Sequence, residues 1–320
     1  AVAMRLTEKD KLVIPVPLYH CFGMVIGVLA CTVVGAAMVF PGTSFDAVET
    51  LSAIQQHRCT ALHGVPTMFI AQLDHPEFRN YDVSSLRTGV MAGAPCPIET
   101  MRRVVNDMHM KEITIAYGMT ETSMNTSNPY DGERRAGTVG MPLAGVEVHI
   151  TDPATGAELP RGEIGMIEVR GPNVFKGYWR NPEKTAQDIR PDGFFITGDL
   201  GSFDGDGYLT ISGRGKDLVI TGGFNVYPKE VESEIDLFTE VVESAVIGVP
   251  HPDLGEGVVA VVVLAKAVFD EKKMVTELQK RLAKFKVPKR IIAVLELPRN
   301  AMGKVQKNKL REAYRDLFKA

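Results

Sequence analysis

The stretch "IAYGMTETS" brings together residue types that could bind a phosphorylated ligand. A short apolar run ends at a glycine and is followed by Thr120, Glu121 and further hydroxyls. Threonine hydroxyls can hydrogen-bond to phosphate oxygens, and a carboxylate can hold Mg²⁺. A polar turn that caps a helix would contain the same residue types, so this stretch alone leaves both interpretations open.

A lysine that follows a glycine in "LPRNAMGKVQKNKL" could reach an oxyanion. A P-loop would need a glycine five residues ahead of Gly303 and a Ser or Thr after Lys304. Pro298 and Val305 occupy those two places, so the stretch is not a P-loop. The local sequence leaves open which group Lys304 contacts.

Two other stretches place candidate ligand-binding residues directly after expected strands. In "FFITGDLG", Asp199 follows a strand and a glycine, where an acid can accept hydrogen bonds from both ribose hydroxyls. In "MAGAP", residues 91–95, small side chains expose a strip of backbone along which a flat ring could lie. A turn aspartate and an ordinary strand-to-helix loop are the alternatives.

The glycine-rich segment "SGRGKDLVITGGFNVYP" contains Arg214 and Lys216 between two differently patterned regions. Such a segment suits a hinge, where a few residues absorb large dihedral changes. A solvated linker is the alternative. Gly222 and Gly223 carry no side chain, which would let a thin ligand pass along the backbone.

Strands and helices that alternate along the first part of the chain must position these residues. Strands are expected at 11–18, 36–40, 60–66 and 85–95, and helices at 23–35, 45–58, 66–76 and 97–108. Asp46 lies near the start of the second helix and Pro66 begins the third. This alternation predicts parallel β-α-β layering, which delivers strand ends into a ligand crevice.

The pattern of expected secondary structure changes after Thr138. Short strands at 146–152, 165–171 and 193–213, separated by Gly, Asp and Pro, predict a smaller, mostly antiparallel sheet. Strands and helices between 228 and 298 then predict a compact α+β unit. We therefore expect an α/β domain over residues 1–213 and a mobile α+β domain over residues 214–320, with a hinge near Lys216.

Composition indicates an ordinary soluble globular protein, with 45% hydrophobic residues, a net charge of −3 and mean hydropathy near zero. The charge gives no reason to expect nucleic acid or an anionic membrane as a general partner, and the basic "KRLAKFKVPKR" lacks aromatic interleaving. Four cysteines without a C-x-x-C pair predict neither a disulfide framework nor a zinc site. A reducing, cytoplasmic location follows as an expectation.

The most apolar stretch runs from Phe22 to Phe40 and contains three glycines. Soluble patterning flanks this stretch, so it predicts a buried helix and strand rather than a membrane span. No signal peptide is recognisable at the start, where charged residues stand in place of an apolar region.

Taken in order, "PLYHCFG", "MAGAP", "YGMTET", "TGD", "GRGKD", "GGFNVYP" and "PRNAMGKVQK" resemble the adenylate-forming (ANL) superfamily over essentially the whole chain. That superfamily comprises acyl-CoA synthetases, adenylation domains of peptide synthetases, and luciferases. The resemblance implies an acyl-adenylate made from ATP and a small carboxylic acid with release of pyrophosphate. It also implies rotation of the C-terminal domain before the acyl group passes to a thiol.

The resemblance implies a role for each matching residue. Lys304 would contact the α-phosphate and carboxylate, Thr120 phosphate, and Glu121 Mg²⁺. The nucleotide and CoA contacts would come from Gly93, Ala94, Pro95, Tyr117, Gly118, Asp199, Arg214, Gly222 and Gly223. His20 and Met119 would line the acyl pocket, although a core histidine is the alternative for His20. Lys216 matches the hinge position.

One family feature has no match in this sequence. The Ser/Thr/Gly-rich phosphate loop that ends in "PKG" should precede "VIPVPLYH", and the chain begins abruptly before that strand. We therefore expect an N-terminally truncated chain that is the rear part of a larger domain. Such a chain is expected to be inactive alone and to fold poorly, because strands of its large sheet would lack partners.

The two halves of the sequence indicate different acids. The first resembles medium-chain fatty acyl-CoA ligases and the second resembles malonyl-CoA synthetases. Malonate would need a cation for its second carboxylate. The helix after "GVPT" offers none, and nothing in the sequence places the nearby His63 and Arg87 in the pocket. An apolar pocket favours a medium-chain acid, with malonate as the alternative.

Two further alternatives concern the fate of the acyl group. The acyl group could pass to a carrier-protein arm, as in peptide-synthetase adenylation domains. A truncated product could instead bind the nucleotide without chemistry. The oligomeric state stays open.

Overall fold

The computed structural model describes residues 1–93, 96–265, 270–300 and 303–319. The chain divides into two compact units. The first comprises Ala1–Thr197 and Gly201–Ile211, and the second comprises Gly198–Leu200 and Ser212–Ala320. Each unit is described by itself below.

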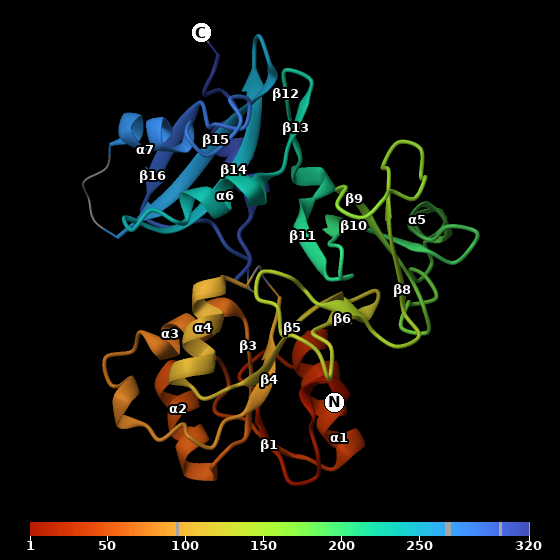
Figure 1. The fold of residues 1–320 in the computed structure, drawn as a ribbon, viewed down its shortest axis with the longest axis vertical. Coiled ribbons are helices and arrows are strands. Elements are labelled where there is room, and N and C mark those ends of the chain that lie inside the picture. The colour runs from red at the N-terminus through yellow and green to blue at the C-terminus, as the bar shows by residue number, and fades with distance from the viewer. Residues whose placement is uncertain (94–95, 266–269, 301–302, 320) are drawn as a thin grey trace. The chain divides into compact units, whose positions relative to one another are not determined.

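The largest sheet, in the first unit, has seven strands within the described residues, in the order β2-β1-β3-β4-β5-β6-β7. These strands are β1 (Lys11–Val13), β2 (Ala37–Val39), β3 (Ala61–Gly64), β4 (Thr88–Met91), β5 (Glu112–Met119), β6 (Ser123–Ser127) and β7 (Met141–Pro142). The pairs β1–β2, β1–β3, β3–β4 and β4–β5 are parallel, and β5–β6 and β6–β7 are antiparallel. Figure 1 shows helices α2 (Ala47–His57), α3 (Pro66–Leu73) and α4 (Ile98–Asp107) on one face of the parallel strands and α1 (Ala30–Val34) on the other.

The α-helices of this unit are α1 (Ala30–Val34), α2 (Ala47–His57), α3 (Pro66–Leu73) and α4 (Ile98–Asp107). A π-helix, η2 (Phe22–Leu29), and two 3₁₀ turns, η1 (Val2–Met4) and η3 (Phe78–Asn80), accompany them. The predicted starts of two helices are confirmed. The Asp46 carboxylate accepts a hydrogen bond from the Glu49 N–H and caps α2, while Pro66 is the first residue of α3. Side chains alternate between the two faces of the sheet: Leu62 and Met91 pack on α2–α4, and Ala61 and Val90 pack on η2 and α1.

The apolar stretch from Phe22 to Phe40 is less buried than the sequence predicts. It forms a π-helical turn, η2, which continues into α1 and the edge strand β2. Phe22 and Cys31 are buried, but Leu29 is 48% exposed and Val33 81% exposed. The expectation of a buried helix and strand is therefore wrong for one side of this segment. No helix among the described residues is both long and apolar enough to cross a membrane.

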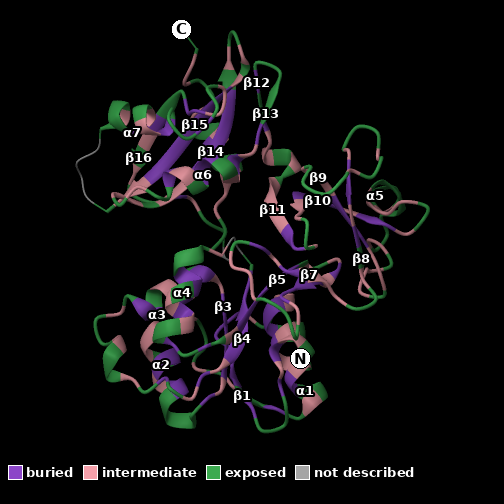
Figure 2. Cartoon of the chain, in the orientation of Figure 1, coloured by how far each residue is buried: buried purple, intermediate pink, exposed green. Residues whose placement is uncertain are grey.

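A smaller sheet follows, with the order β11-β10-β9-β8 in the described part of the chain. Its strands are β8 (Glu147–Thr151), β9 (Gly165–Arg170), β10 (Phe195–Phe203) and β11 (Leu209–Arg214), and helix α5 (Pro182–Asp188) lies between β9 and β10 in the chain. Val148, Ile150, Ile167 and Val169 form its core. Figure 2 shows buried residues along the strands of both sheets.

The second unit is an α+β fold. It contains η4 (Gly215–Asp217), β12 (Val219–Thr221), β13 (Phe224–Val226), α6 (Pro228–Ile235), β14 (Val241–His251), β15 (Gly255–Leu264), α7 (Glu271–Leu278), β16 (Arg290–Val294) and α8 (Lys307–Ala313). The antiparallel hairpin β14–β15 forms the centre of this unit, and its alternate residues are buried on opposite faces. Helix α7 ends at Leu278. The predicted α/β class, with a mainly parallel sheet, a smaller sheet and an α+β unit, is confirmed.

Candidate active site

Thr120, Glu121 and Thr122 form the tight turn of a β-hairpin. Met119 at the end of β5 pairs with Ser123 at the start of β6, and the strands are antiparallel there. A Cβ atom at Gly118 would lie 1.7 Å from the Ser123 carbonyl oxygen, so glycine is required for this close approach. The alternative of a turn that caps a helix is therefore wrong, because the chain returns as a strand.

The backbone carbonyl of Glu121 accepts a hydrogen bond, and one oxygen of its carboxylate contacts a hydroxyl group. The Phe175 N–H donates to the Glu121 carbonyl at 2.8 Å, and the Asn173 side-chain amide donates to the Thr122 carbonyl at 2.8 Å. The Tyr178 hydroxyl lies 3.3 Å from Glu121 Oε1. Among the described residues, no lysine, arginine or histidine forms an ion pair with Glu121.

This environment fits a hard cation. Mg²⁺ keeps several waters and takes one or two protein carboxylates together with substrate phosphates. Glu121 provides one uncompensated carboxylate, and the exposed Thr120 provides a neighbouring hydroxyl. Thr122 Oγ1 is buried without a hydrogen-bond partner in the described chain, which adds an unsatisfied polar atom behind the turn. No group of three or more metal-ligating side chains occurs in the described ranges.

The neighbouring strand β4 ends close to the predicted adenine contact. Gly93 has a φ of 86°, and a Cβ atom there would lie 3.1 Å from Val65 Cγ1. Ala94 and Pro95 lie outside the described residues. Tyr117 is buried in the core of the smaller sheet, beside Val148 and Ile150, while Met119 is half-buried.

His20 is half-buried just before η2, and its Nδ1 accepts a hydrogen bond from the Phe22 N–H at 3.1 Å. His63 is fully buried. The Val90 N–H donates to His63 Nδ1 at 3.3 Å, which leaves Nε2 to donate to the Ile26 carbonyl at 3.2 Å. Burial lowers the pKa of His63 to about 4, so this ring is neutral at pH 7. His63 is therefore a core histidine and supplies no cation.

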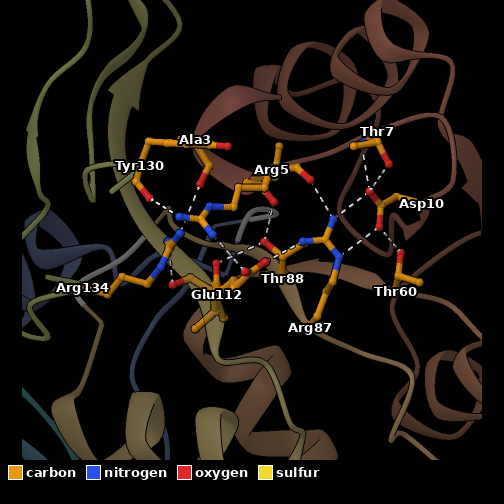
Figure 3. Close-up of polar contacts among 12 residues, drawn as sticks. Ala3, Arg5, Thr7, Asp10, Thr60, Arg87, Thr88, Glu112, Tyr130 and Arg134 are labelled. Atoms are coloured by element: carbon orange, nitrogen blue, oxygen red, sulfur yellow. Dashed lines mark hydrogen bonds and ion pairs between the residues drawn. The ribbon is translucent and has the colours of Figure 1, made fainter. Parts of the chain in front are cut away.

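Arg87 is engaged at the opposite end of its strand from Gly93. Its guanidinium lies 2.7 Å from Asp10 Oδ2 and 2.5 Å from Glu112 Oε2, and donates to the Arg5 carbonyl at 2.7 Å. Figure 3 shows Arg87 between the two carboxylates. Arg87 precedes β4, whereas ligands bind beyond the carboxyl ends of parallel strands. Neither cation that the sequence offered for a second substrate carboxylate is free to take that role.

Asp199 and Arg214 form an ion pair within the second unit. The Arg214 Nε atom lies 3.2 Å from Asp199 Oδ1, and Asp199 is 6% exposed. Lys216 follows in η4 and is exposed. The next residue, Asp217, pairs with Arg311 of α8 at 2.8 Å. Ion pairs on both sides thus flank the two residues Gly215 and Lys216.

Gly222 and Gly223 form the two-residue turn between β12 and β13. Thr221 pairs with Phe224, and the glycines have φ values of 55° and 82°. Two positive φ angles define a type I′ turn, which requires such residues. A Cβ atom at Gly223 would meet nothing within 4 Å. The turn geometry accounts for both glycines, and their contact with CoA stays a prediction.

Lys304 lies in a loop closed by hydrogen bonds. The Lys304 N–H donates to Asn300 Oδ1 at 3.0 Å, and the Gly303 N–H donates to the Asn300 carbonyl at 2.9 Å. Gly303 has a φ of 74°, which favours glycine. Arg299 bridges the loop to Glu243 of β14. These contacts join Asn300, Gly303 and Lys304 to one another, and Arg299 links them to β14.

The structure thus gathers the predicted residues into local groups. Thr120, Glu121 and Met119 share one hairpin beside the strand that leads to Gly93, and Asp199 pairs with Arg214. Sequence reasoning missed Asn173 and Tyr178. Tyr178 stands 57 residues from Glu121 in the chain. The one local signal is its position between Gly177 and helix α5, which begins at Pro182.

Comparison with known proteins adds to this geometry. Residues 1–179 match the AMP-binding enzyme family, and residues 230–304 match the AMP-binding enzyme C-terminal domain. The YngI protein of Bacillus subtilis (strain 168) is 45% identical over 323 residues, covering 99% of this chain and 58% of that protein. The mitochondrial medium-chain acyl-CoA ligase ACSF2 of Danio rerio is 40% identical over 312 residues, covering 95% of this chain and 51% of that protein.

A crystal structure of ATP-bound MatB from Rhodopseudomonas palustris has a similar fold, with a TM-score of 0.92 and 52% identity. The match covers 99% of this chain and 62% of that one. The chain thus spans about half to three fifths of the length of these relatives. With both family matches and this fold, the chain belongs to the family of AMP-binding enzymes, within the adenylate-forming superfamily.

Proposed function

We propose that this chain carries the nucleotide, acyl and CoA contacts of an AMP-forming acid–CoA ligase, which makes an acyl-adenylate from ATP and then an acyl-CoA. Adenylate formation from ATP by this chain alone stays predicted not to occur, because the sequence has no match to the family's phosphate loop. The observation that supports this most is the hairpin that presents Thr120 and the uncompensated Glu121 carboxylate. A neutral, fully paired carboxyl group at this turn would not attract a cation. The charge instead suits a site for the phosphates of ATP with Mg²⁺.

In the first half-reaction, Thr120 binds phosphate oxygens and Glu121 holds Mg²⁺, which neutralises phosphate charge when bound. Lys304 stabilises the charge that develops between the carboxylate and the α-phosphate. Asp199, oriented by Arg214, accepts hydrogen bonds from the ribose hydroxyls. Gly93, together with Ala94 and Pro95, borders the adenine.

In the second half-reaction, the CoA thiol attacks the acyl-adenylate carbonyl and AMP leaves. We assign the change of domain orientation between the half-reactions to a hinge at Lys216, with domains over 1–213 and 214–320. Exposed Lys216, beside a glycine and between two ion pairs, supports this assignment. Gly222 and Gly223 would border the pantetheine arm. The cytoplasmic location stays a prediction.

A medium-chain monocarboxylic acid is the proposed substrate, bound beside His20 and Met119. The relative ACSF2 is named as a medium-chain acyl-CoA ligase. His63 is neutral and buried, and Arg87 is paired with two carboxylates, so neither supports a second substrate carboxylate. Each buried CH₂ of an alkyl chain adds roughly 0.8 kcal/mol of binding free energy.

Malonate is the second candidate, because stretches in the second half of the chain resemble malonyl-CoA synthetases. Isothermal titration calorimetry with two acyl-sulfamoyl adenosines, which mimic the acyl-adenylates without reacting, separates the candidates. We expect the octanoyl compound to bind at least tenfold more tightly than the malonyl compound, which would bury an unpaired charge. Tighter binding of the malonyl compound would contradict the substrate, and binding of neither would contradict the function.

A further inference from the structure

We propose that Tyr178 is a positioning residue for Glu121: its hydroxyl, set between Glu121 and Asp188, orients the carboxylate that faces the divalent cation. The inference rests on the proposed function, because it assigns a partner to the proposed cation ligand. The three residues come from the β5–β6 turn, the segment after β9, and the end of α5.

One phenolic hydrogen serves two carboxylates. The Tyr178 oxygen lies 3.3 Å from Glu121 Oε1 and 3.2 Å from Asp188 Oδ2. A phenol donates a single hydrogen, so it bonds to one carboxylate at a time. Both distances exceed the length of about 2.5–2.7 Å that is usual when a hydroxyl donates to a carboxylate. The hydroxyl therefore stands between two acceptors rather than tightly on one.

The two carboxylates differ in how their charge is balanced. Lys184 Nζ lies 2.7 Å from Asp188 Oδ1, one helical turn away on α5. Glu121 forms no ion pair within the described chain, and the hydroxyl contacts only its Oε1. Glu121 Oε2 is thereby left to a cation, while Oε1 is fixed by the tyrosine. The tyrosine hydroxyl carries the hydrogen that a carboxylate oxygen can accept.

Tyr178 is also held in place by a ring contact and a backbone hydrogen bond. Its ring packs edge-on against Phe175 at 4.8 Å, and its N–H donates to Thr185 Oγ1 at 2.9 Å. Gly177 has a φ of 136°, and a Cβ atom there would lie 2.6 Å from Thr185 Cγ2. Glycine thus lets the segment lie close to α5. In the same segment, the Phe175 N–H donates a hydrogen bond to the Glu121 carbonyl. The segment therefore contacts both the backbone and the carboxylate of Glu121.

Hydrogen bonds to a metal-binding carboxylate orient it, and loss of such a partner typically weakens metal binding by about 10–100-fold. Tyr178→Phe removes the hydroxyl and keeps the ring. Tyr208→Phe is the matched control, because the buried Tyr208 hydroxyl donates to the Glu133 carbonyl at 2.7 Å and contacts no candidate ligand. Glu121→Gln removes the proposed cation ligand itself.

The test measures the dissociation constants of Mg·ATP and of AMP by calorimetry on the full chain, without acid or CoA, together with thermal melting. We expect Tyr178→Phe and Glu121→Gln to weaken Mg·ATP about tenfold and to change AMP less than about twofold. Tyr208→Phe should lower the melting temperature and leave the dissociation constants of Mg·ATP and of AMP unchanged.

Each other outcome decides between the two proposals. If Glu121→Gln weakens Mg·ATP and Tyr178→Phe does not, the positioning role is wrong and the proposed function stands. If Tyr178→Phe weakens AMP and Mg·ATP equally, its role is structural and the inference is overturned. If Glu121→Gln leaves Mg·ATP unchanged, or if the unmodified chain binds neither nucleotide, the cation site fails and the inference fails with it.

Discussion

The guanidinium of Arg311 lies 2.8 Å from the carboxylate of Asp217, which joins helix α8 to the residue that directly follows the proposed hinge. The side chains of Arg311 and Asp217 are 29% and 15% exposed. Because α8 begins three residues after Lys304, this contact links the proposed hinge segment to the helix that follows the loop of the proposed catalytic lysine. Asp217 is thereby held within the second unit by a side-chain ion pair.

Replacement of Arg311 by methionine should destabilise the second unit by about 1–3 kcal/mol, because it leaves the Asp217 carboxylate largely buried without its partner. Urea denaturation followed by circular dichroism measures this change. Arg315→Met is the control, since Arg315 is exposed and lies just beyond the same helix. Equal stability of the two variants would show that the ion pair does not anchor the segment.

Alanine at Gly118 should disrupt the hairpin that carries Thr120 and Glu121. Its Cβ would lie 1.7 Å from the Ser123 carbonyl oxygen, and backbone cannot move aside as a flexible side chain can. We expect a loss of at least about 3 kcal/mol in the free energy of unfolding. Gly205→Ala serves as the control, because its Cβ would meet nothing within 4 Å. A Gly118→Ala protein as stable as this control would contradict the hairpin geometry.

The buried His63 should make stability depend on pH. Its pKa is about 4 in the folded chain, below the ordinary 6.5, so the unfolded chain binds a proton first as the pH falls. The stabilisation is therefore complete above pH 6.5 and is lost between 6.5 and 4, by roughly 2–3 kcal/mol in total. Denaturation at several pH values compares the chain with His63→Gln, which does not titrate. A variant with the same pH dependence over this window would show that another group is responsible.

The sequence predicts the architecture well where local signals agree with the fold. Alternating apolar runs and helical patterns identify β1, β3 and β4 with α2–α4, and Asp46 and Pro66 mark helix starts because capping and a fixed φ are local properties. The exposure of Leu29 and Val33 does not follow from the pattern, because hydrophobicity alone does not say what packs against a residue.

The site is harder to predict than the fold, since it depends on contacts between distant segments. The pattern after Gly118 suits a helix cap as well as a hairpin turn, and only the approach of Ser123 decides between them. Arg87 and His63 are close in sequence to the strand ends, yet the fold places Arg87 before β4 in ion pairs and buries His63. The contact between Tyr178 and Glu121 joins residues 57 apart in the chain, so no local pattern predicts it.

The central claim is that this chain transfers an acyl group from an adenylate to CoA, and the direct test supplies that intermediate. Synthetic octanoyl-adenylate and CoA are mixed with the chain, and octanoyl-CoA and AMP are measured by mass spectrometry. Because the β- and γ-phosphates take no part, only the proposed nucleotide, acyl and CoA contacts are tested. We predict octanoyl-CoA and AMP in equal amounts, formed at least a hundredfold faster than without protein, with Gly205→Ala equally active. Formation at the rate without protein, or release of free octanoate in place of the thioester, would contradict the assignment as an acid–CoA ligase.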